Sequence, residues 1–292
     1  MLSLHTNAAA LSAQNSITRT QNSLSTSQTR LSTGFRINSA MDDAAGLQIA
    51  TRLKAQTSGM SVAMRNTQNS ISLMQTAEGA LDETTNILIR MKDLATQAAD
   101  GSSNASDKTA MQSEFDALTQ ELTNIVGNTS FGGQKLMNDT TGTFAAAGGV
   151  NFQIGASTAE KMNVDVSTSI ATMHASILAA ASGYVNTGVA ATPAGTELTA
   201  SAGATIDLLK TAIDDVGSVR SALGAASNRL DHVYNNLANV STNTKAATGR
   251  IMDTDFATES SNMTSSQMLL QAGTAMLKQS NSTSSLVLSL LQ

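Results

Sequence analysis

The chain has 292 residues, a net charge of −5, 13% charged and 3% aromatic side chains, and no cysteine. The missing cysteines exclude disulfides and thiolate metal sites, and no run approaches the ~18 apolar residues of a membrane span. Dense basic patches are absent, so nucleic-acid binding is not expected. Aromatic side chains dominate ordinary protein cores, so their scarcity here favours closely packed helices. The chain has a single proline, so little interrupts long helices.

The N-terminal segment predicts a helix over about residues 1–34, with Gly34 as its C-terminal stop. Residues 1–40 contain no acidic and three basic side chains. The start has no basic n-region, so a Sec-type signal peptide is not expected. Apolar residues recur every seven positions, at Ala10, Ile17, Leu24 and Leu31. Such a helix needs a partner for its apolar stripe, and another copy of the chain is one candidate.

The next segment, residues 35–57, mixes loop and helix signals. A long helix is then predicted over about residues 58–99, because two apolar lines follow coiled-coil spacing. These lines are Met74, Leu81, Leu88 and Ala95, with Ala77, Met91 and Ala98. Residues 100–104 predict a turn. A second helix follows, with apolar residues at Phe115, Leu118, Leu122 and Ile125.

The middle of the chain changes pattern at Phe131. Two runs then alternate apolar and polar residues and predict a β-hairpin, at Val150, Phe152 and Ile154 and at Met162, Val164 and Val166. Residues 171–202 have weak periodicity and predict a surface connection.

Helical periodicity returns in the C-terminal third. Its apolar line comprises Leu209, Val216, Leu223, Leu230 and Leu237, with Ile206, Ile213 and Tyr234 beside it. After Gly249 a terminal helix is predicted whose last residues, 260–292, carry only the charge of Lys278. Its line comprises Phe256, Met263, Leu270, Leu277 and Leu291. The predicted fold is therefore mainly α, with long antiparallel helices in a coiled-coil-like bundle and a small β-hairpin region.

Catalytic patterns are missing. The histidines, His5, His174 and His232, are far apart, and no HExxH motif occurs. No glycine pair is followed by Gly-Lys-Ser/Thr, as a phosphate loop requires. We therefore expect no enzyme activity, no cofactor and no metal.

The most specific motifs lie near the two ends. Residues 30–52 read RLSTGFRINSAMDDAAGLQIATR, and residues 250–259 read RIMDTDFATE. Together with TAEGAL at residues 76–81 and LATQAA at residues 94–99, they closely resemble bacterial flagellin. The resemblance covers roughly residues 1–140 and 205–292.

The resemblance implies a domain plan. Residues 1–43 and 250–292 match the terminal coiled coil that lines the filament channel, called D0. Residues 44–170 and 203–249 match the helical bundle with a small β region, called D1. The short variable connection, residues 171–202, leaves no room for the outer domains D2 and D3 of larger relatives. The chain resembles a minimal flagellin, and a polar or a lateral filament both remain open.

The same resemblance assigns assembly residues. The D0 helices carry Ile17, Leu24, Leu31, Met263, Leu270, Leu277 and Leu291. Since burying an unpaired charge is costly, Ser, Thr, Asn and Gln are expected to bond across helices or to channel water instead. The connector between D0 and D1 contains Arg36, Asn38, Asp42 and Asp43. These side chains are expected either to contact neighbouring subunits or to cap the following helix.

A surface on the second helix is implied as a protofilament contact and as the site recognised by the animal Toll-like receptor for flagellin. Its residues are Arg90, Leu94 and, on the next helix, Glu114. Leu94 lies off the apolar seam and is directed away from it. The alternatives for such residues are a solvated face or packing against a neighbouring helix of the bundle. Ile89 stands where flagellins commonly have a polar residue.

The function implied is a structural subunit that polymerises into the flagellar filament outside the cell. Implied partners are further copies of the chain, an export chaperone at the C-terminal helix, the filament cap and the hook–filament junction proteins. Export through the flagellar type III apparatus is implied as well. The alternative functions are a hook–filament junction adaptor and an enzyme on a flagellin frame, the latter disfavoured by the missing HExxH.

Overall fold

The computed structural model describes residues 7–187 and 195–289, and over these residues the chain is mainly helical, as predicted. The chain divides into two compact units. Unit 1 is formed from residues 1–57 and 242–292, and unit 2 from residues 58–241. Each unit is described separately below.

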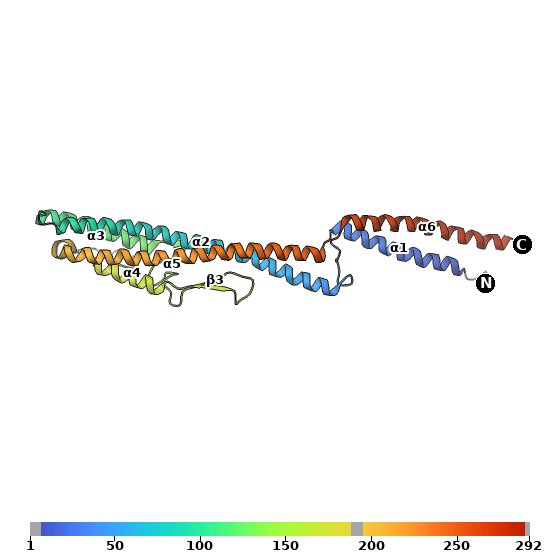
Figure 1. Ribbon diagram of the computed structural model, residues 1–292, viewed down its shortest axis with the longest axis horizontal. Helices are drawn as coiled ribbons and strands as arrows, with labels where there is room; N and C mark the ends of the chain where they lie inside the picture. Colours follow the sequence, from blue (N-terminus) through green and yellow to red (C-terminus); the bar gives the residue numbers. More distant parts are fainter. Residues whose placement is uncertain (1–6, 188–194, 290–292) are drawn as a thin grey trace. The chain divides into compact units, whose positions relative to one another are not determined.

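Figure 1 labels the helices and strands. The helices are α1 (Ala8–Thr33), α2 (Ala44–Ala99), α3 (Ala105–Asn128), α4 (Ser167–Ala180), α5 (Glu197–Met252) and α6 (Phe256–Ser289). The strands are β1 (Ser130–Phe131), β2 (Gln134–Lys135), β3 (Val150–Gln153) and β4 (Lys161–Val164).

Unit 1 is built on α1 and α6, which run side by side (Figure 1). The side chain of Asn7 caps α1 by accepting a hydrogen bond from the N–H of Ala10, at 3.1 Å. The helix ends as predicted at Gly34, whose φ of 75° is the left-handed conformation that glycine adopts most readily.

Helix α2 begins at Ala44, so the predicted start near residue 58 is wrong. Asp43 supplies the start signal: its Oδ1 accepts a hydrogen bond from the N–H of Gly46 at 2.8 Å, and its carbonyl accepts the first helical bond from Leu47. Residues between Ala44 and residue 57 lack a regular apolar line, which is why periodicity alone placed them outside the helix.

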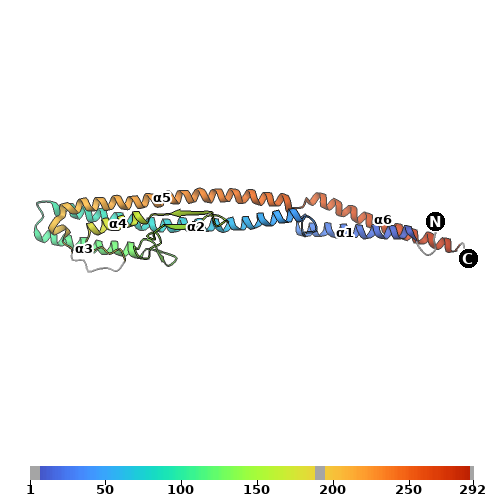
Figure 2. The same cartoon turned by 90° about the horizontal axis from the view of Figure 1, so that it is seen from below.

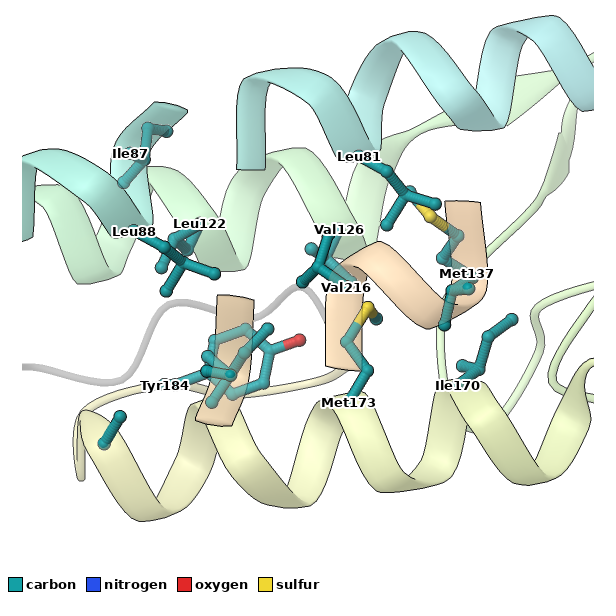
Figure 3. Close-up of a cluster of buried hydrophobic side chains, with 14 of the residues drawn as sticks. Leu81, Ile87, Leu88, Leu122, Val126, Met137, Ile170, Met173, Tyr184 and Val216 are labelled. Carbon is teal, nitrogen blue, oxygen red and sulfur yellow. The ribbon is translucent and has the colours of Figure 1, made fainter. Parts of the chain in front are cut away.

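The core of unit 2 follows the predicted seams. Every member of the two apolar lines on α2 is at most 1% exposed, and Leu209, Val216, Leu223 and Leu230 on α5 are equally buried. Figure 3 shows part of this cluster, which includes Leu88 of α2 and Leu122 of α3. Leu237, by contrast, is only half-buried.

Side-chain bonds fix the relation of these long helices within unit 2. Arg220 on α5 forms an ion pair with Asp82 on α2 at 2.9 Å, and Ser227 donates to the sulfur of Met74. From the first contact to the second, the residue number on α5 rises while the residue number on α2 falls. The two helices are therefore antiparallel, as predicted (Figure 2).

Two short antiparallel strand pairs complete the secondary structure. The predicted hairpin is confirmed: β3 pairs with β4, with Val150 opposite Val164 and Phe152 opposite Met162. The pattern break after Phe131 is a tight turn joining β1 to β2, in which Gly132 has a φ of 58°.

The prediction of a surface connection over residues 171–202 is wrong. Helix α4 occupies its first part, and Met173, Ile177, Tyr184 and Leu198 are at most 3% exposed in the core (Figure 3). Helix α4 is short and rich in alanine and serine, so its apolar face gives little periodicity although the surrounding helices bury it. Residues 188–194 lie outside the described residues.

His174 joins α4 to the segments on either side of it. Its Nε2 lies 2.8 Å from the carbonyl of Met137, and its Nδ1 lies 2.7 Å from the hydroxyl of Tyr184. A carbonyl only accepts, so the bonding pattern assigns the proton to Nε2 and makes Nδ1 the acceptor from Tyr184. Burial lowers the pKa of His174, against the opposing effects of the Met137 carbonyl and the charge of Asp139.

This geometry predicts a pH dependence. With its pKa below the ordinary 6.5, folded His174 binds fewer protons than the unfolded chain, so its contribution is complete above pH 6.5 and is lost as the pH falls further. We expect the urea unfolding free energy of wild type to fall more between pH 7 and pH 5 than that of His174→Gln. The buried carboxylates are common to both chains and cancel in the comparison. An equal fall in both chains would contradict the assignment.

Candidate assembly site

The predicted D0 residues meet at the seam of α1 and α6. Ile17, Leu24 and Leu31 on α1 are half-buried, as are Met263, Leu270 and Leu277 on α6. The helix pair therefore covers these side chains only in part. Leu291 lies outside the described residues.

Other large apolar side chains of the pair face outward. They are between 52% and 66% exposed and comprise Leu11, Phe256, Met268, Leu269 and Met276. Leu269 and Met276 are seven residues apart and share one face of α6. Large exposed apolar side chains that share one helix face are typical of an interaction surface.

The two units differ sharply in core. Among the described residues, the buried hydrophobic side chains of unit 1 are Ile37 and Ala50, whereas all the others belong to unit 2. The free energy gained from apolar burial within unit 1 is therefore small, and it does little to offset the entropy cost of ordering two long helices.

The threonine side chains of α1 bond within their own helix. The hydroxyls of Thr18, Thr20, Thr26, Thr29 and Thr33 each donate to the carbonyl four residues earlier, at 2.9 to 3.0 Å. Within the subunit these threonines do not bond across the helix pair, whereas Asn7 bonds across it to Ser280. A helix satisfied in this way presents methyl groups and few charges to its surroundings.

The connector is organised by two aspartates. Oδ2 of Asp42 accepts hydrogen bonds from the N–H groups of Asn38 and Ser39 at 3.0 and 2.9 Å, and from the Ser39 hydroxyl. The hydrogen bonds from Ser39 and Asn38 lower the pKa of Asp42. Asp43 caps α2, so the structure shows the capping role, and contacts with neighbouring subunits stay a prediction.

Arg36 lies against the end of α5 rather than against either aspartate. The side-chain Nη2 of Arg36 donates to the carbonyl of Ile251 at 2.9 Å, and the backbone N–H of Arg36 donates to the carbonyl of Met252 at 2.6 Å. A cation at a helix C-terminus satisfies carbonyls that lack helical partners and stabilises the dipole. Asn38 donates to the carbonyl of Phe35, which closes the turn.

Sequence reasoning missed the second strand of the connector. Phe35 forms an isolated antiparallel bridge with Asp253, and the N–H of Thr254 donates to the carbonyl of Gly34 at 3.0 Å. The backbone makes these bonds, so no side-chain pattern could have indicated the pairing. The connector is thus a two-stranded joint between the N- and C-terminal segments.

On unit 2, the structure brings Arg90 and Glu114 together. Nη2 and Nε of Arg90 lie 2.6 and 2.9 Å from the same carboxylate oxygen, and both side chains are about half exposed. Ile89 is 46% exposed beside them. Leu94 is 2% exposed, so it does not form part of the outer surface, and the alternative that it packs against a neighbouring helix of the bundle is confirmed. Helix α2 packs against several neighbours, which bury a wider stripe than a two-position seam.

Two family models match the chain. The bacterial flagellin N-terminal helical region matches residues 4–141, and the bacterial flagellin C-terminal helical region matches residues 206–291. Flagellin A of Vibrio anguillarum is 35% identical over 383 aligned positions that cover all of both chains. Polar flagellin F of Vibrio parahaemolyticus is 35% identical over 380 positions, covering 99% of both. These alignments are longer than 292 residues, so both relatives carry residues without a counterpart here.

A solved structure of a putative flagellar hook-associated protein from Vibrio parahaemolyticus is also similar. It has a TM-score of 0.54 at 15% identity, over 73% of this chain and 100% of that one, which shows a likeness of fold alone. Over the described residues, no helix combines the length and the apolar character needed to cross a bilayer.

The connector geometry predicts the effect of Asp42→Ala. Removing the acceptor of three hydrogen bonds releases the turn from Asn38 to Asp42, so limited proteolysis should cleave this turn faster than in wild type. Asp42→Asn keeps a weaker, neutral acceptor and should be intermediate. Met41→Ala, at a side chain that is 97% exposed, is the control and should match wild type. Equal cleavage of all four chains would remove the structural role given to Asp42.

Proposed function

Since the chain belongs to the bacterial flagellin family and is a structural subunit of the flagellar filament, we propose that α1 and α6 form its polymerisation element. As a member of this family the chain is a structural protein and not an enzyme, and its place is the filament outside the cell. The observation that carries the proposal is the apolar face of α6, left open in the single subunit at Met268, Leu269 and Met276.

The charge distribution supports the same role. The paired region has few charges, so neighbouring copies can cover it without burying an unpaired ion, which would cost several kcal/mol. The few buried apolar side chains of unit 1 support a second step: both chain ends are disordered in the free monomer and fold upon joining the filament. Proteases would then trim both ends of the monomer before they cut unit 2.

The domain assignment follows from this role. Residues 1–43 and 250–292 form D0, which lines the channel, and residues 44–249 supply D1. Helix α4 and Tyr184 belong to the D1 core rather than to a variable connection. The segment between the two family matches, residues 142–205, is short here, which supports a minimal flagellin without D2 and D3.

Partners beyond the polymer follow from the family. An export chaperone binds the open apolar face of α6 before secretion, and the chain leaves unfolded through the flagellar type III apparatus. The filament cap and the hook–filament junction proteins contact the polymer at its ends. A junction adaptor remains the second candidate function, and unlimited elongation separates the filament subunit from it.

A seeded elongation assay tests the polymerisation role. Purified wild type should extend filament fragments without limit, whereas an adaptor would stop after a short ring. The double variant Met268→Ser, Leu269→Ser should elongate at least about tenfold more slowly, because each lost apolar contact at an interface weakens addition by about 1 kcal/mol or more. Leu178→Ser, at a comparably exposed residue of unit 2, is the control for lost surface hydrophobicity. Elongation of the double variant at the wild-type rate would refute the role of this face.

A second recognition role is carried by the ion pair of Arg90 with Glu114. It presents a fixed, half-exposed guanidinium beside the apolar Ile89, a combination suited to a protein partner. We propose that this surface serves as a protofilament contact and as the surface that the animal Toll-like receptor recognises. Leu94 acts only by packing beneath it.

Receptor activation by soluble protein tests this role. Arg90→Ala should reduce receptor activation at equal concentration while leaving the far-UV circular dichroism of the chain unchanged. Arg220→Ala removes another surface ion pair of unit 2, with Asp82, and serves as the matched control. Undiminished activation by Arg90→Ala would exclude the receptor role, and seeded elongation of the same variant reports separately on the protofilament contact.

A further inference from the structure

One glycine of the α1–α6 pair, Gly273, lies very close to the partner helix. A Cβ atom built on Gly273 of α6 would lie 2.9 Å from Cγ1 and 3.6 Å from Cδ1 of Ile17 on α1. The first distance is shorter than carbon atoms tolerate. Gly273 therefore forms a socket that admits the Ile17 side chain because it has no side chain of its own.

Polar contacts on both sides of the socket keep the same alignment. Toward the connector, Arg30 pairs with Glu259 at 3.7 Å, and the Glu259 side chain is only 9% exposed. Toward the other end, Asn7 donates to the hydroxyl and carbonyl of Ser280 at 3.2 and 3.3 Å. In all three contacts the α6 number falls as the α1 number rises, so one antiparallel register satisfies them together.

The apolar seam cannot select that register by itself. Ile17, Leu24 and Leu31 repeat every seven residues, as do Met263, Leu270 and Leu277. Sliding one helix by seven residues therefore brings large apolar side chains opposite one another again. Such a slide moves the helices by about 10 Å, at 1.5 Å per residue. A heptad seam needs a distinctive residue to exclude the alternative alignments.

We propose that Gly273 is a register-determining residue: it seats Ile17 and so fixes the axial alignment of α1 and α6, and with it the position of the face that neighbouring copies must meet. This inference rests on the proposed polymerisation role of the pair. After a slide of seven residues, Leu24 or Ala10 would face Gly273, and the contacts of Arg30 and Asn7 would both be lost.

Introduced cysteines report the register directly, because the chain has none of its own. Asn7→Cys with Ser280→Cys joins positions in contact in the observed register. Gln14→Cys with Ser280→Cys joins positions that would meet only after a slide of seven residues. Oxidation should cross-link the first pair within one chain and leave the second pair largely free. Both pairs are read by gel mobility on polymerised protein, because the chain ends are proposed to be disordered in the soluble monomer.

Gly273→Val then tests the socket. We expect it to slow seeded elongation about tenfold, as overpacking of a close contact predicts, and to move cross-linking from the first cysteine pair toward the second. Gly217→Val on α5 is the matched control, since it also places a β-branched residue in a helix but meets no atom within 4 Å. Ile17→Ala should restore elongation to Gly273→Val, because it removes the side chain with which valine collides.

Normal elongation and unchanged cross-linking in Gly273→Val would overturn the inference. So would slow elongation that Ile17→Ala fails to restore, since that result means general damage to α6. Failure of the wild-type chain to extend seeds would instead count against the polymerisation role. In that case the register is read on the soluble protein, where cross-linking of the first pair would support the inference and cross-linking of neither pair would overturn it.

Discussion

The pairing of two nearly uncharged helices is the interaction on which this molecule depends. In α1 and α6 the large apolar side chains are half-buried at the seam or more than half exposed beyond it, and only a few charges interrupt them. A pair of helices can cover one stripe on each partner, so any wider apolar surface needs additional neighbours. Repeated copies of the same chain supply such neighbours with no further partner, which is how a filament follows from the composition of its ends.

Unit 2, by contrast, has a buried core of its own. Its helices bury the apolar lines almost completely, and Ile170 and Met173 of α4 lie in the same cluster (Figure 3). Met162 and Val164 of the β3–β4 hairpin also belong to this cluster. Its buried polar groups are satisfied internally, as Gln112 shows by donating to Glu197 and accepting from the N–H of Leu198. A unit of this kind can fold before assembly. We therefore propose that unit 2 is stable alone and that unit 1 is stabilised by joining the filament.

Much of this was predictable from the sequence because heptad spacing is a strong signal in long helices. The α2 and α5 seams, the end of α1 at Gly34 and the β3–β4 hairpin follow from periodicity and turn chemistry. Helix α4 was missed because a short alanine-rich helix buried by several neighbours has no marked polar face. The start of α2 was not predicted because it depends on one capping bond from Asp43 and not on periodicity. The burial of Leu94 was not fixed by the seam pattern, because more than one neighbouring helix covers α2. The pairing of Phe35 with Asp253 and the seating of Ile17 on Gly273 join positions far apart in the chain, and a single sequence carries no local sign of such contacts.

The most direct test of the account is seeded elongation by a chain that lacks both residues 1–43 and residues 250–292. Unit 2 contains nearly all of the buried apolar side chains, so this chain should remain helical and unfold cooperatively in urea. It should nevertheless add no length to filament fragments that the full chain extends. Long fibres built from the shortened chain would contradict the account, because polymerisation would then arise from unit 2 and the apolar ends would need another explanation.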